Sequence, residues 1–397
     1  MRVAIINSVY GKGSTGKIVR EIEKRVIESG NECKCYYGRK SGNENGGEYF
    51  GSKFSVLSHA LFSRIFGRQG LYSRKATKQL IKKLKEYKPD VINLHNIHGY
   101  YLNYKILFKY LKQSNIPVVW TLHDLWAITG HCACFEEFEC EKWKTGCIKC
   151  THKKEYPKAI FENSKKNYKL KQEIFSLQNL IFVSPSEWLK NNLKESFLKQ
   201  YHCEVINNGI DLSVFSKKES DFVEKYNLQN KKIILGVSPF WTIGKGANTF
   251  NKLAQDLDDS FVVVTVGESQ GVTFNEKVRA LPKTSSIKEL VEIYSASDLF
   301  INPTLIDNFP TVNIEALACG LPVVTYNTGG SGEMIDDTCG TKVEKGNYPE
   351  LLKAIVNFDY TTKTAENCQN KAKQFDSKDK FNRYIDLFLE VINESVI

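Results

Sequence analysis

The sequence predicts an α/β protein with two doubly wound domains, each a parallel sheet covered by helices on both faces. Three observations support this fold class. The chain has 397 residues, of which 42% are apolar, so it can bury two sizeable hydrophobic cores. Short β-rich runs alternate with helical segments almost from end to end, as in parallel sheets with crossover helices. The alternation starts a second time near Lys231, so the fold is expected twice.

Five apolar runs in the first half are expected to be buried parallel strands. They lie at residues 3–8, 33–38, 90–95, 117–122 and 179–184. Between them, helical patterns are found at residues 17–28, 74–87 and 102–113. Such strands, covered on both sides, form the core of a doubly wound domain.

The second half repeats the pattern, with expected strands at residues 232–237, 261–267, 299–303 and 322–326. An irregular stretch at residues 201–215 contains Asn207-Asn208-Gly209 and predicts the hinge. The chain therefore divides into domains at residues 1–202 and 203–376, followed by a final helix in residues 377–397. This helix is amphipathic and must bury one face. Its apolar side chains at helical spacing are Phe381, Tyr384, Ile385, Phe388, Leu389 and Ile392.

Composition narrows the classes of partner and compartment. No apolar run is long enough to span a bilayer, and the start MRVAIINSVYGKG is too short and glycine-rich for a signal peptide, so we expect a cytoplasmic protein. Residues 1–200 carry 35 Lys/Arg against 18 Asp/Glu, a balance of +17, whereas the remainder carries 20 against 27, a balance of −7. A basic half fits phosphate-bearing lipids or a membrane surface. No nucleic-acid-binding motif accompanies it, so no nucleic acid is expected.

The most informative segment is NPTLIDNFPTVNIEALACGLPVVTYNTGG at residues 302–330, which predicts a strand, a loop, a helix and a second strand. Pro310 suits the first helical position. The amides of Thr311 and Val312 then point out of the helix N-terminus and form an anion site. Asp307 and Glu315 stand at the two ends of this turn, placed to hold the hydroxyls of a sugar and a ribose that flank a diphosphate.

This segment is similar to the signature of family-4 retaining glycosyltransferases, in which an acid, seven residues and a glutamate stand inside EGFG…EAMACG.PVV. Here it reads Asp307-Asn308-Phe309-Pro310 and then EALACGLPVV from Glu315, with Asp in place of the usual first Glu. The resemblance implies the GT-B architecture, in which two Rossmann-like domains face each other across a cleft. It also implies that residues 377–397 cross back onto the N-terminal domain.

Further stretches extend the resemblance over most of the chain. The turn from Gly236 to Gly246 resembles the family's VGR…KG turn, with Lys245 at the matching position and no counterpart of its arginine. His123-Asp124 matches the HD position, where the histidine approaches the transferred sugar. The glycine-rich turn GKGSTGK at residues 11–17 resembles a family loop that faces the donor diphosphate, and it also nearly spells a P-loop. Ile18 replaces the P-loop hydroxyl, which disfavours an ATPase.

The resemblance implies retaining, metal-independent transfer of a hexose-type sugar from a UDP- or GDP-linked donor to a hydroxyl of a glycan acceptor. The acceptor is expected to be lipid-linked, as in surface polysaccharide biosynthesis, and no cofactor is expected for catalysis. A leaving-group phosphate oxygen takes the acceptor proton. The residues expected to be catalytic are Asp307, His123 and Lys245. Those expected to bind the donor are Gly13, Ser14, Lys245, Asn308, Phe309, Thr311, Val312 and Glu315.

Two other functions remain open. A nucleotide-sugar epimerase on the same fold would convert the donor without an acceptor. A non-catalytic nucleotide-sugar-binding module is suggested by the missing arginine and by the shorter acid at Asp307.

Five of the eleven cysteines fall within the segment HCACFEEFECEKWKTGCIKC, which ends at Cys150. Cys147-x-x-Cys150 can share a tetrahedral zinc ion with Cys140 and with Cys132 or Cys134, and His131 and His152 are spare ligands. Because the compartment is expected to be reducing, a disulfide is the weaker alternative, and idle thiols are the third. Such a zinc site would be structural.

Residues 53–68, KFSVLSHALFSRIFGR, form a basic amphipathic helix with Phe54, Leu57 and Leu61 on one face. Such a helix can lie in a membrane interface at the inner face of the cell membrane, and an ordinary domain helix with a solvated basic face is the alternative.

Overall fold

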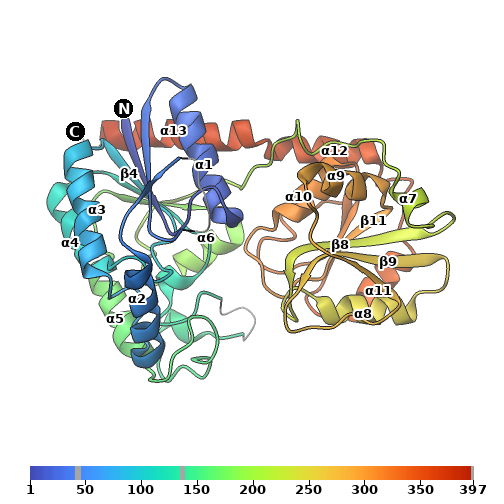
Figure 1. The fold of residues 1–397 in the computed structure, drawn as a ribbon, viewed down its shortest axis with the longest axis horizontal. Coiled ribbons are helices and arrows are strands. Elements are labelled where there is room, and N and C mark those ends of the chain that lie inside the picture. The colour runs from blue at the N-terminus through green and yellow to red at the C-terminus, as the bar shows by residue number, and fades with distance from the viewer. Residues whose placement is uncertain (41–45, 135–138, 395–397) are drawn as a thin grey trace. The chain divides into compact units, whose positions relative to one another are not determined.

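The computed structural model describes residues 1–40, 46–134 and 139–394, and the chain forms two compact units. Unit 1 contains Met1–Ile206 and the chain from Lys380 onward, and unit 2 contains Asn207–Asp379 (Figure 1). The last three residues of the predicted final helix, 395–397, lie outside the described residues. Within the described ranges, no helix is both long enough and apolar enough to cross a membrane.

Unit 1 is built on a seven-stranded sheet in the order β3-β2-β1-β4-β5-β6-β7, and each pair of neighbours is parallel. The strands are β1 (Arg2–Asn7), β2 (Glu32–Tyr37), β3 (Glu48–Tyr49), β4 (Val91–Leu94), β5 (Val118–Thr121), β6 (Leu180–Ser184) and β7 (Cys203–Val205). The chain moves outward in one direction from β1 to β3 and in the other from β4 to β7. The carboxyl ends of β1 and β4 therefore mark the switch point, where doubly wound sheets bind ligands.

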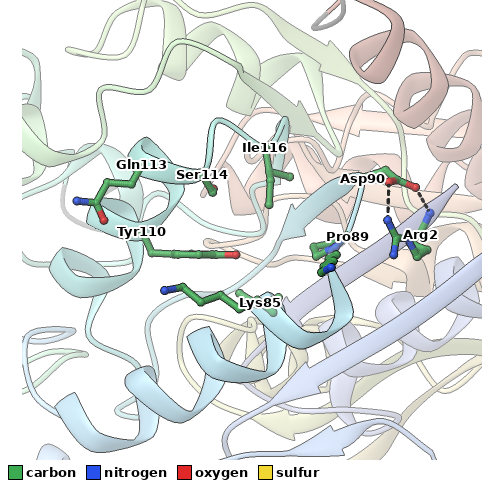
Figure 2. A pocket seen from close by; sticks show the side chains of 10 residues that line it. Arg2, Lys85, Pro89, Asp90, Tyr110, Gln113, Ser114 and Ile116 are labelled. Atoms are coloured by element: carbon green, nitrogen blue, oxygen red, sulfur yellow. Dashed lines mark hydrogen bonds and ion pairs between the residues drawn. The ribbon is translucent and has the colours of Figure 1, made fainter.

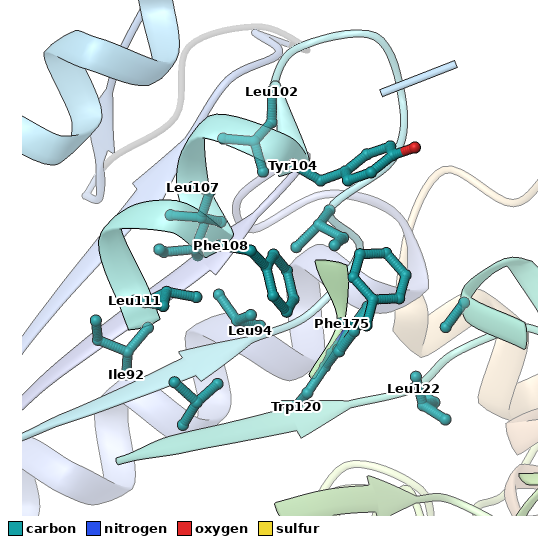
Figure 3. Packing of buried hydrophobic residues seen from close by; sticks show 14 of the residues in the cluster. Ile92, Leu94, Leu102, Tyr104, Leu107, Phe108, Leu111, Trp120, Leu122 and Phe175 are labelled. Atoms are coloured by element: carbon teal, nitrogen blue, oxygen red, sulfur yellow. The ribbon is translucent and has the colours of Figure 1, made fainter. Parts of the chain in front are cut away.

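Helices cover both faces of this sheet because alternate strand residues are apolar on each side. Val3 and Ile5 pack with α1 (Gly13–Glu28) and α13 (Ser377–Glu394), whereas Ala4 and Ile6 face the opposite cluster. That second face carries α3 (Arg74–Tyr87), α4 (Tyr104–Ser114), α5 (Ser164–Ile174) and α6 (Glu187–Lys194). Figure 3 shows its centre, where Phe108, Trp120 and Phe175 pack against one another. The final helix thus completes the core of unit 1.

Unit 2 has a six-stranded parallel sheet in the order β10-β9-β8-β11-β12-β13. The strands are β8 (Lys232–Trp241), β9 (Phe261–Ser269), β10 (Val278–Leu281), β11 (Leu299–Asn302), β12 (Val323–Tyr326) and β13 (Gly340–Val343). One face packs against α8 (Ala247–Asp256) and α11 (Tyr348–Val356), and the other against α9 (Ile287–Ala296), α10 (Thr311–Ala318) and α12 (Ala365–Ala372). The switch point of this sheet lies between β8 and β11.

The remaining described elements are short or lie outside the sheets. They are α2 (Lys53–Phe66) and the 3₁₀ turns η1 (Trp126–Ile128) and η3 (Lys142–Lys144) in unit 1, and α7 (Phe222–Lys225) and η4 (Lys373–Phe375) in unit 2. The predicted α/β class with two parallel sheets is confirmed.

Several local predictions were wrong. Helix α1 begins at Gly13 and not at residue 17, so the glycine-rich turn forms the first turn of the helix despite its low helix propensity. Pro310 is the N-cap of α10 and not its first helical residue. Strand β8 runs through Trp241, with an irregular register between Val237 and Phe240, so the turn after it is shorter than predicted. Leu389 was expected on the buried face of the final helix, but its side chain is exposed.

Candidate active site

Unit 2 places two oppositely charged side chains at the switch point of its sheet. Lys245 lies in the loop after β8, and Asp307 lies in the loop after β11, the neighbouring strand. The Lys245 Nζ donates to Asp307 Oδ2 over 2.6 Å and to the carbonyl of Ile306 over 3.2 Å. Both side chains remain partly exposed, so an anionic ligand can reach the lysine.

Backbone contacts hold these two loops together. The Leu305 amide donates to the carbonyl of Gly244 over 2.8 Å. Gly246 has a φ of +81°, and a Cβ at this position would lie 2.5 Å from the carbonyl oxygen of Pro303. Only glycine allows this approach without moving the backbone. The match of Lys245-Gly246 to the family turn thus has a steric reason.

Helix α10 begins next to this ion pair and carries Glu315. As first-turn residues, Thr311 and Val312 have amides without an i−4 acceptor inside the helix. The Glu315 carboxylate accepts from Thr311 Oγ1 over 3.3 Å and from Tyr294 Oη over 3.1 Å. Burial and Glu315 raise the pKa of the Tyr294 phenol well above 10, so it stays a donor. Glu315 is therefore positioned from two elements before any ligand binds.

The other predicted donor-binding residues of this loop differ in what they offer. The carbonyl of Asn308 accepts from the Gly330 amide over 3.0 Å, which ties the loop to the chain after β12. Phe309 is buried in the core beside Phe375, so only its backbone is available to a ligand.

Sequence reasoning missed a buried amide network behind α10. Asn313 Oδ1 accepts from Asn302 Nδ2 over 2.8 Å, and its Nδ2 donates to the Ser331 carbonyl over 3.3 Å. The Ser331 and Thr328 hydroxyls are also buried and find no partner among the described residues. Asn313 lies inside the signature helix, and a buried side-chain amide needs hydrogen-bond partners, so this residue was the signal in the sequence for such a network.

Unit 1 gathers four polar side chains at the carboxyl ends of β4 and β5. His98 Nε2 bonds Asp124 Oδ2 over 2.8 Å, and Asp124 Oδ1 accepts from the Trp126 amide over 2.9 Å. Burial raises the pKa of Asp124, but the charge and hydrogen bond of His98 outweigh burial and hold this pKa below its usual range. Both carboxylate oxygens of Asp124 thus have a hydrogen-bond partner within unit 1.

The second pair, His95 and His123, forms a hydrogen-bonded chain that starts at Asn93. The hydrogen bonds of Asn93 determine which ring nitrogens carry protons. Asn93 Nδ2 donates to the Val119 carbonyl, so Asn93 Oδ1 must accept from His95 Nε2 over 2.8 Å. Burial, together with His123, lowers the pKa of His95 well below 6.5, so its Nδ1 is an acceptor. His123 Nε2 must therefore donate to it over 2.8 Å.

This chain fixes the tautomer of His123. Burial lowers the pKa of His123 to about 4, so at neutral pH the ring is neutral and its Nδ1 carries a lone pair. The ring is partly exposed. It can therefore accept a hydrogen bond from a hydroxyl group.

Gly13 and Ser14 lie in unit 1, in the exposed first turn of α1. Asn7, at the end of β1, joins this turn to the loop after β4, because its Oδ1 accepts from the Asn96 amide over 3.2 Å and its Nδ2 donates to Thr15 Oγ1 over 3.5 Å. The predicted site residues thus form two groups: Gly13, Ser14 and His123 in unit 1, and the remaining donor-binding and catalytic residues in unit 2.

A pocket lies at the amino ends of β1 and β4, away from the residues described above (Figure 2). The ion pair between Arg2 and Asp90 borders it, together with Lys85 and Tyr110. It is at the opposite end of the sheet from His95 and His123, whereas ligands of doubly wound sheets bind at the carboxyl ends. We therefore do not assign the active site to this pocket.

The four predicted zinc ligands Cys132, Cys140, Cys147 and Cys150 line one small cavity in unit 1. All eleven cysteines of the chain are free thiols.

Two family profiles cover nearly the whole chain. The profile described as Glycosyltransferase Family 4 matches residues 15–214, and the one described as Glycosyl transferases group 1 matches residues 218–375. The chain belongs to glycosyltransferase family 4. Its site residues therefore belong to a glycosyltransferase, and the two matched regions correspond to the two units.

Relatives and solved structures agree with the family. The Escherichia coli K12 protein WcaC, provisionally named a colanic acid biosynthesis glycosyl transferase, is 23% identical over 98% of this chain and 99% of its own length. A Campylobacter jejuni α-1,3-N-acetylgalactosaminyltransferase that acts on N,N'-diacetylbacillosaminyl-diphospho-undecaprenol is 27% identical, over 53% of this chain and 60% of its own. The Anabaena protein HepE, solved with UDP and glucose, superposes with a TM-score of 0.70 at 15% identity, covering 98% and 100% of the two chains. Sucrose-phosphate synthase from Thermosynechococcus elongatus gives a TM-score of 0.71 at 15% identity over 99% of each chain, and both structures show the GT-B fold.

Proposed function

We propose that this glycosyltransferase moves a sugar, with retention of anomeric configuration, from a nucleoside-diphosphate sugar to a hydroxyl of a lipid-linked glycan in surface polysaccharide biosynthesis. The observation that carries the proposal is the cluster at the switch point of unit 2. There Lys245 and Asp307 lie on adjacent loops, and α10 adds its N-terminus and a second acid, Glu315. Each matches one part of a nucleotide-sugar: Lys245 and α10 the diphosphate, Glu315 the ribose, and Asp307 the sugar.

The proposed reaction breaks the bond between the anomeric carbon and the diphosphate oxygen and forms a bond from that carbon to the acceptor oxygen on the same face. The acceptor proton passes to the leaving phosphate. Negative charge grows on the diphosphate, where Lys245 and the amides of Thr311 and Val312 stabilise it. In metal-dependent transferases a divalent ion stabilises this charge. Because Lys245 and the two amides take that role here, we propose that the transfer is metal-independent.

His123 has a separate role in this proposal. Because its Nδ1 is a bare acceptor at neutral pH, it selects a donor sugar with a hydroxyl at the contacted position. A carboxylate there would face a lone pair and be rejected.

The donor base is proposed to be uracil or guanine, and UDP is supported by the UDP bound to HepE. The lipid-linked acceptor is supported by relatives that act on diphospho-undecaprenol glycans.

The test combines donor binding with product analysis. UDP-, GDP-, ADP- and dTDP-sugars are screened by thermal shift on the wild type and on Glu315→Ala. We expect one nucleotide to raise the Tm of the wild type and not that of the variant. With that donor and a diphospho-undecaprenol glycan, NMR of the product should show the donor's anomeric configuration. A flat panel with folded protein contradicts the donor site, and donor turnover without any acceptor indicates an epimerase.

We further propose that unit 1 docks on an anionic membrane through α2. Phe54, Leu57 and Leu61 on this helix are 80%, 70% and 56% exposed. Ile160 and Phe161, both 57% exposed, extend the patch, because their amides bond the Arg64 and Ile65 carbonyls at the end of α2. Residues 49–85 contain nine Lys/Arg and no Asp or Glu. Exposed apolar side chains in so basic a setting fit an anionic bilayer surface.

Vesicle sedimentation tests this surface. The wild type should bind vesicles containing phosphatidylglycerol at least about tenfold more tightly than phosphatidylcholine vesicles, and Leu57→Ser/Leu61→Ser should lose most of that binding. Ile287→Ser, which removes an exposed apolar side chain from unit 2, is the matched control and should bind like the wild type. Equal binding by the double variant would contradict the assignment.

A further inference from the structure

The segment after η1 in unit 1 forms a small, nearly apolar cavity whose wall carries many sulfur and nitrogen donors. Cys132, Cys140, Cys147 and Cys150 line it together with His131. Cysteine and histidine around one small space are the ligand set of structural zinc.

His131 gives an independent sign of a missing ligand. The side chain is only 6% exposed, and its Nε2 is buried without a hydrogen-bond partner among the residues described. The carbonyls of Lys153 and Pro157 hydrogen-bond the ring, which leaves Nδ1 as the nitrogen that faces them. A histidine that donates a hydrogen bond from one ring nitrogen to a carbonyl and directs the other nitrogen into a cavity has the arrangement of a metal ligand. An orphaned nitrogen is costly in the absence of such a ligand.

Backbone amides are already directed at two of the sulfurs. The Gly130 amide donates to Cys147 Sγ over 3.1 Å, and the His152 amide bonds Cys150. Burial outweighs these donors and raises the pKa of both thiols, so the amides show that the two sulfurs are held in place and not that they are ionised. Cys147 and Cys150 are also the two cysteines of the C-x-x-C turn.

The donors are gathered but not yet at ligand spacing. Among the described residues, the only three ligand atoms that all lie within 4.8 Å of one another belong to Glu23, Cys33 and Cys35 in another part of unit 1. Zinc–sulfur bonds of about 2.3 Å require sulfurs about 4 Å apart. Binding at the cysteine cavity must therefore draw these side chains inward.

We propose that this cavity binds one structural Zn²⁺ through Cys140, Cys147, Cys150 and one donor of the adjacent pair His131 and Cys132. Binding exchanges the thiol protons for the ion, so affinity rises with pH. Four protein ligands leave no open position, which makes the site structural. The proposal is independent of the identity of donor and acceptor.

The position of the cavity gives the ion a consequence for the active site. The Leu125 amide donates to the carbonyl of Ala133 over 2.9 Å, and Leu125 directly follows Asp124. Lys171, which is buried, donates to the carbonyls of Trp126 and Thr129 on the same segment. Zinc would fix the far side of this segment and so hold the backbone that follows His123 and Asp124.

The first measurement is the metal content of the full-length wild type, produced with a tag free of histidine and purified without chelator. We expect about one zinc per folded chain. Replacement by Co²⁺ should give the intense visible bands of tetrahedral thiolate coordination. Folded wild-type protein with less than about 0.1 zinc per chain and no Co²⁺ spectrum would overturn the proposal. A Cys147–Cys150 disulfide found by mass spectrometry would do the same.

Variants then locate the ion. Cys147→Ser and Cys150→Ser should each lose the zinc, whereas Cys33→Ser should retain it as the matched control from the other donor cluster. If zinc is lost in Cys33→Ser and kept in Cys147→Ser, the site is elsewhere and the proposal fails. Co²⁺ spectra of His131→Ala and Cys132→Ser identify the fourth ligand. Because the wild-type measurements need no variant, poor folding of a serine variant does not prevent a decision.

Discussion

Replacing Lys245 with Met should separate catalysis from stability, because the structure predicts a large effect on one and a small effect on the other. Lys245 Nζ and Asp307 Oδ2 are 2.6 Å apart. At this distance and an effective dielectric constant of about 20, the Coulomb attraction is about 6 kcal/mol before desolvation and screening are counted. Their side chains are 37% and 22% exposed, so solvent cancels most of this attraction. The net loss of unfolding free energy is expected to be about 1 kcal/mol or less.

The effect on the reaction should be much larger. In the proposed mechanism Lys245 is the only side-chain cation assigned to the leaving diphosphate, and losing one preorganised donor at a developing charge typically costs about 10²–10³ in rate. We expect kcat/KM of Lys245→Met to fall about 100-fold, which corresponds to about 3 kcal/mol of transition-state stabilisation.

The assay is nucleotide release with saturating acceptor, together with denaturant unfolding of the same samples. Lys288→Met is the matched control, since it breaks a more exposed lysine–glutamate pair on α9 of unit 2 at 3.8 Å. It should change neither the rate nor the stability appreciably. A folded Lys245→Met enzyme within about threefold of the wild-type kcat/KM would refute the assignment of Lys245 to the diphosphate.

Two further predictions concern the acid and the histidines. Glu315→Gln removes the charge but keeps one acceptor oxygen for Thr311 or Tyr294. Nucleotide affinity measured by calorimetry should therefore fall about tenfold, while the Tm changes little. Unchanged affinity would exclude a contact between Glu315 and the ribose. The pKa of His123 is depressed in the folded state to about 4, so the unfolded chain binds more protons below pH 6.5. The stability due to a neutral His123 is therefore present above pH 6.5 and lost as the pH falls from 6.5 to 4, by about 1.4 kcal/mol per pKa unit. Urea unfolding at several pH values should show that His123→Gln loses less free energy of unfolding than the wild type as the pH falls. An identical loss in both proteins would contradict the depressed pKa of His123.

The elements that could be predicted from sequence are those with long, regular patterns. Helix α3 and the central strands other than β8 were placed within one or two residues, because a buried parallel strand needs a continuous apolar run. The strands β3, β7, β10 and β13 were missed because edge strands are short and half-exposed.

The residues of the candidate site could be selected from the sequence, but their arrangement in space could not. Asp307, Glu315 and Lys245 could be selected from their motifs, yet the ion pair depends on β8 lying beside β11, and no local pattern gives this order. The same holds for Tyr294, which reaches Glu315 from a different helix. Phe309 was assigned to donor binding because it lies within the motif, but a lone aromatic between polar residues gives no periodicity from which its burial can be read.

The return of α13 to unit 1 has a consequence for synthesis on the ribosome. Unit 2 is continuous in sequence and can fold as soon as its last residue has emerged, whereas the sheet of unit 1 lacks one of its covering helices until the end of the chain. At about 5–20 residues per second, roughly 10–40 s pass between the emergence of Ile206 and that of Glu394 at the end of α13. During this interval the face that later contacts Phe381, Tyr384 and Phe388 is open to chaperones and to aggregation. Premature termination just after Asp379 would thus release a chain with a complete unit 2 and an unfinished unit 1.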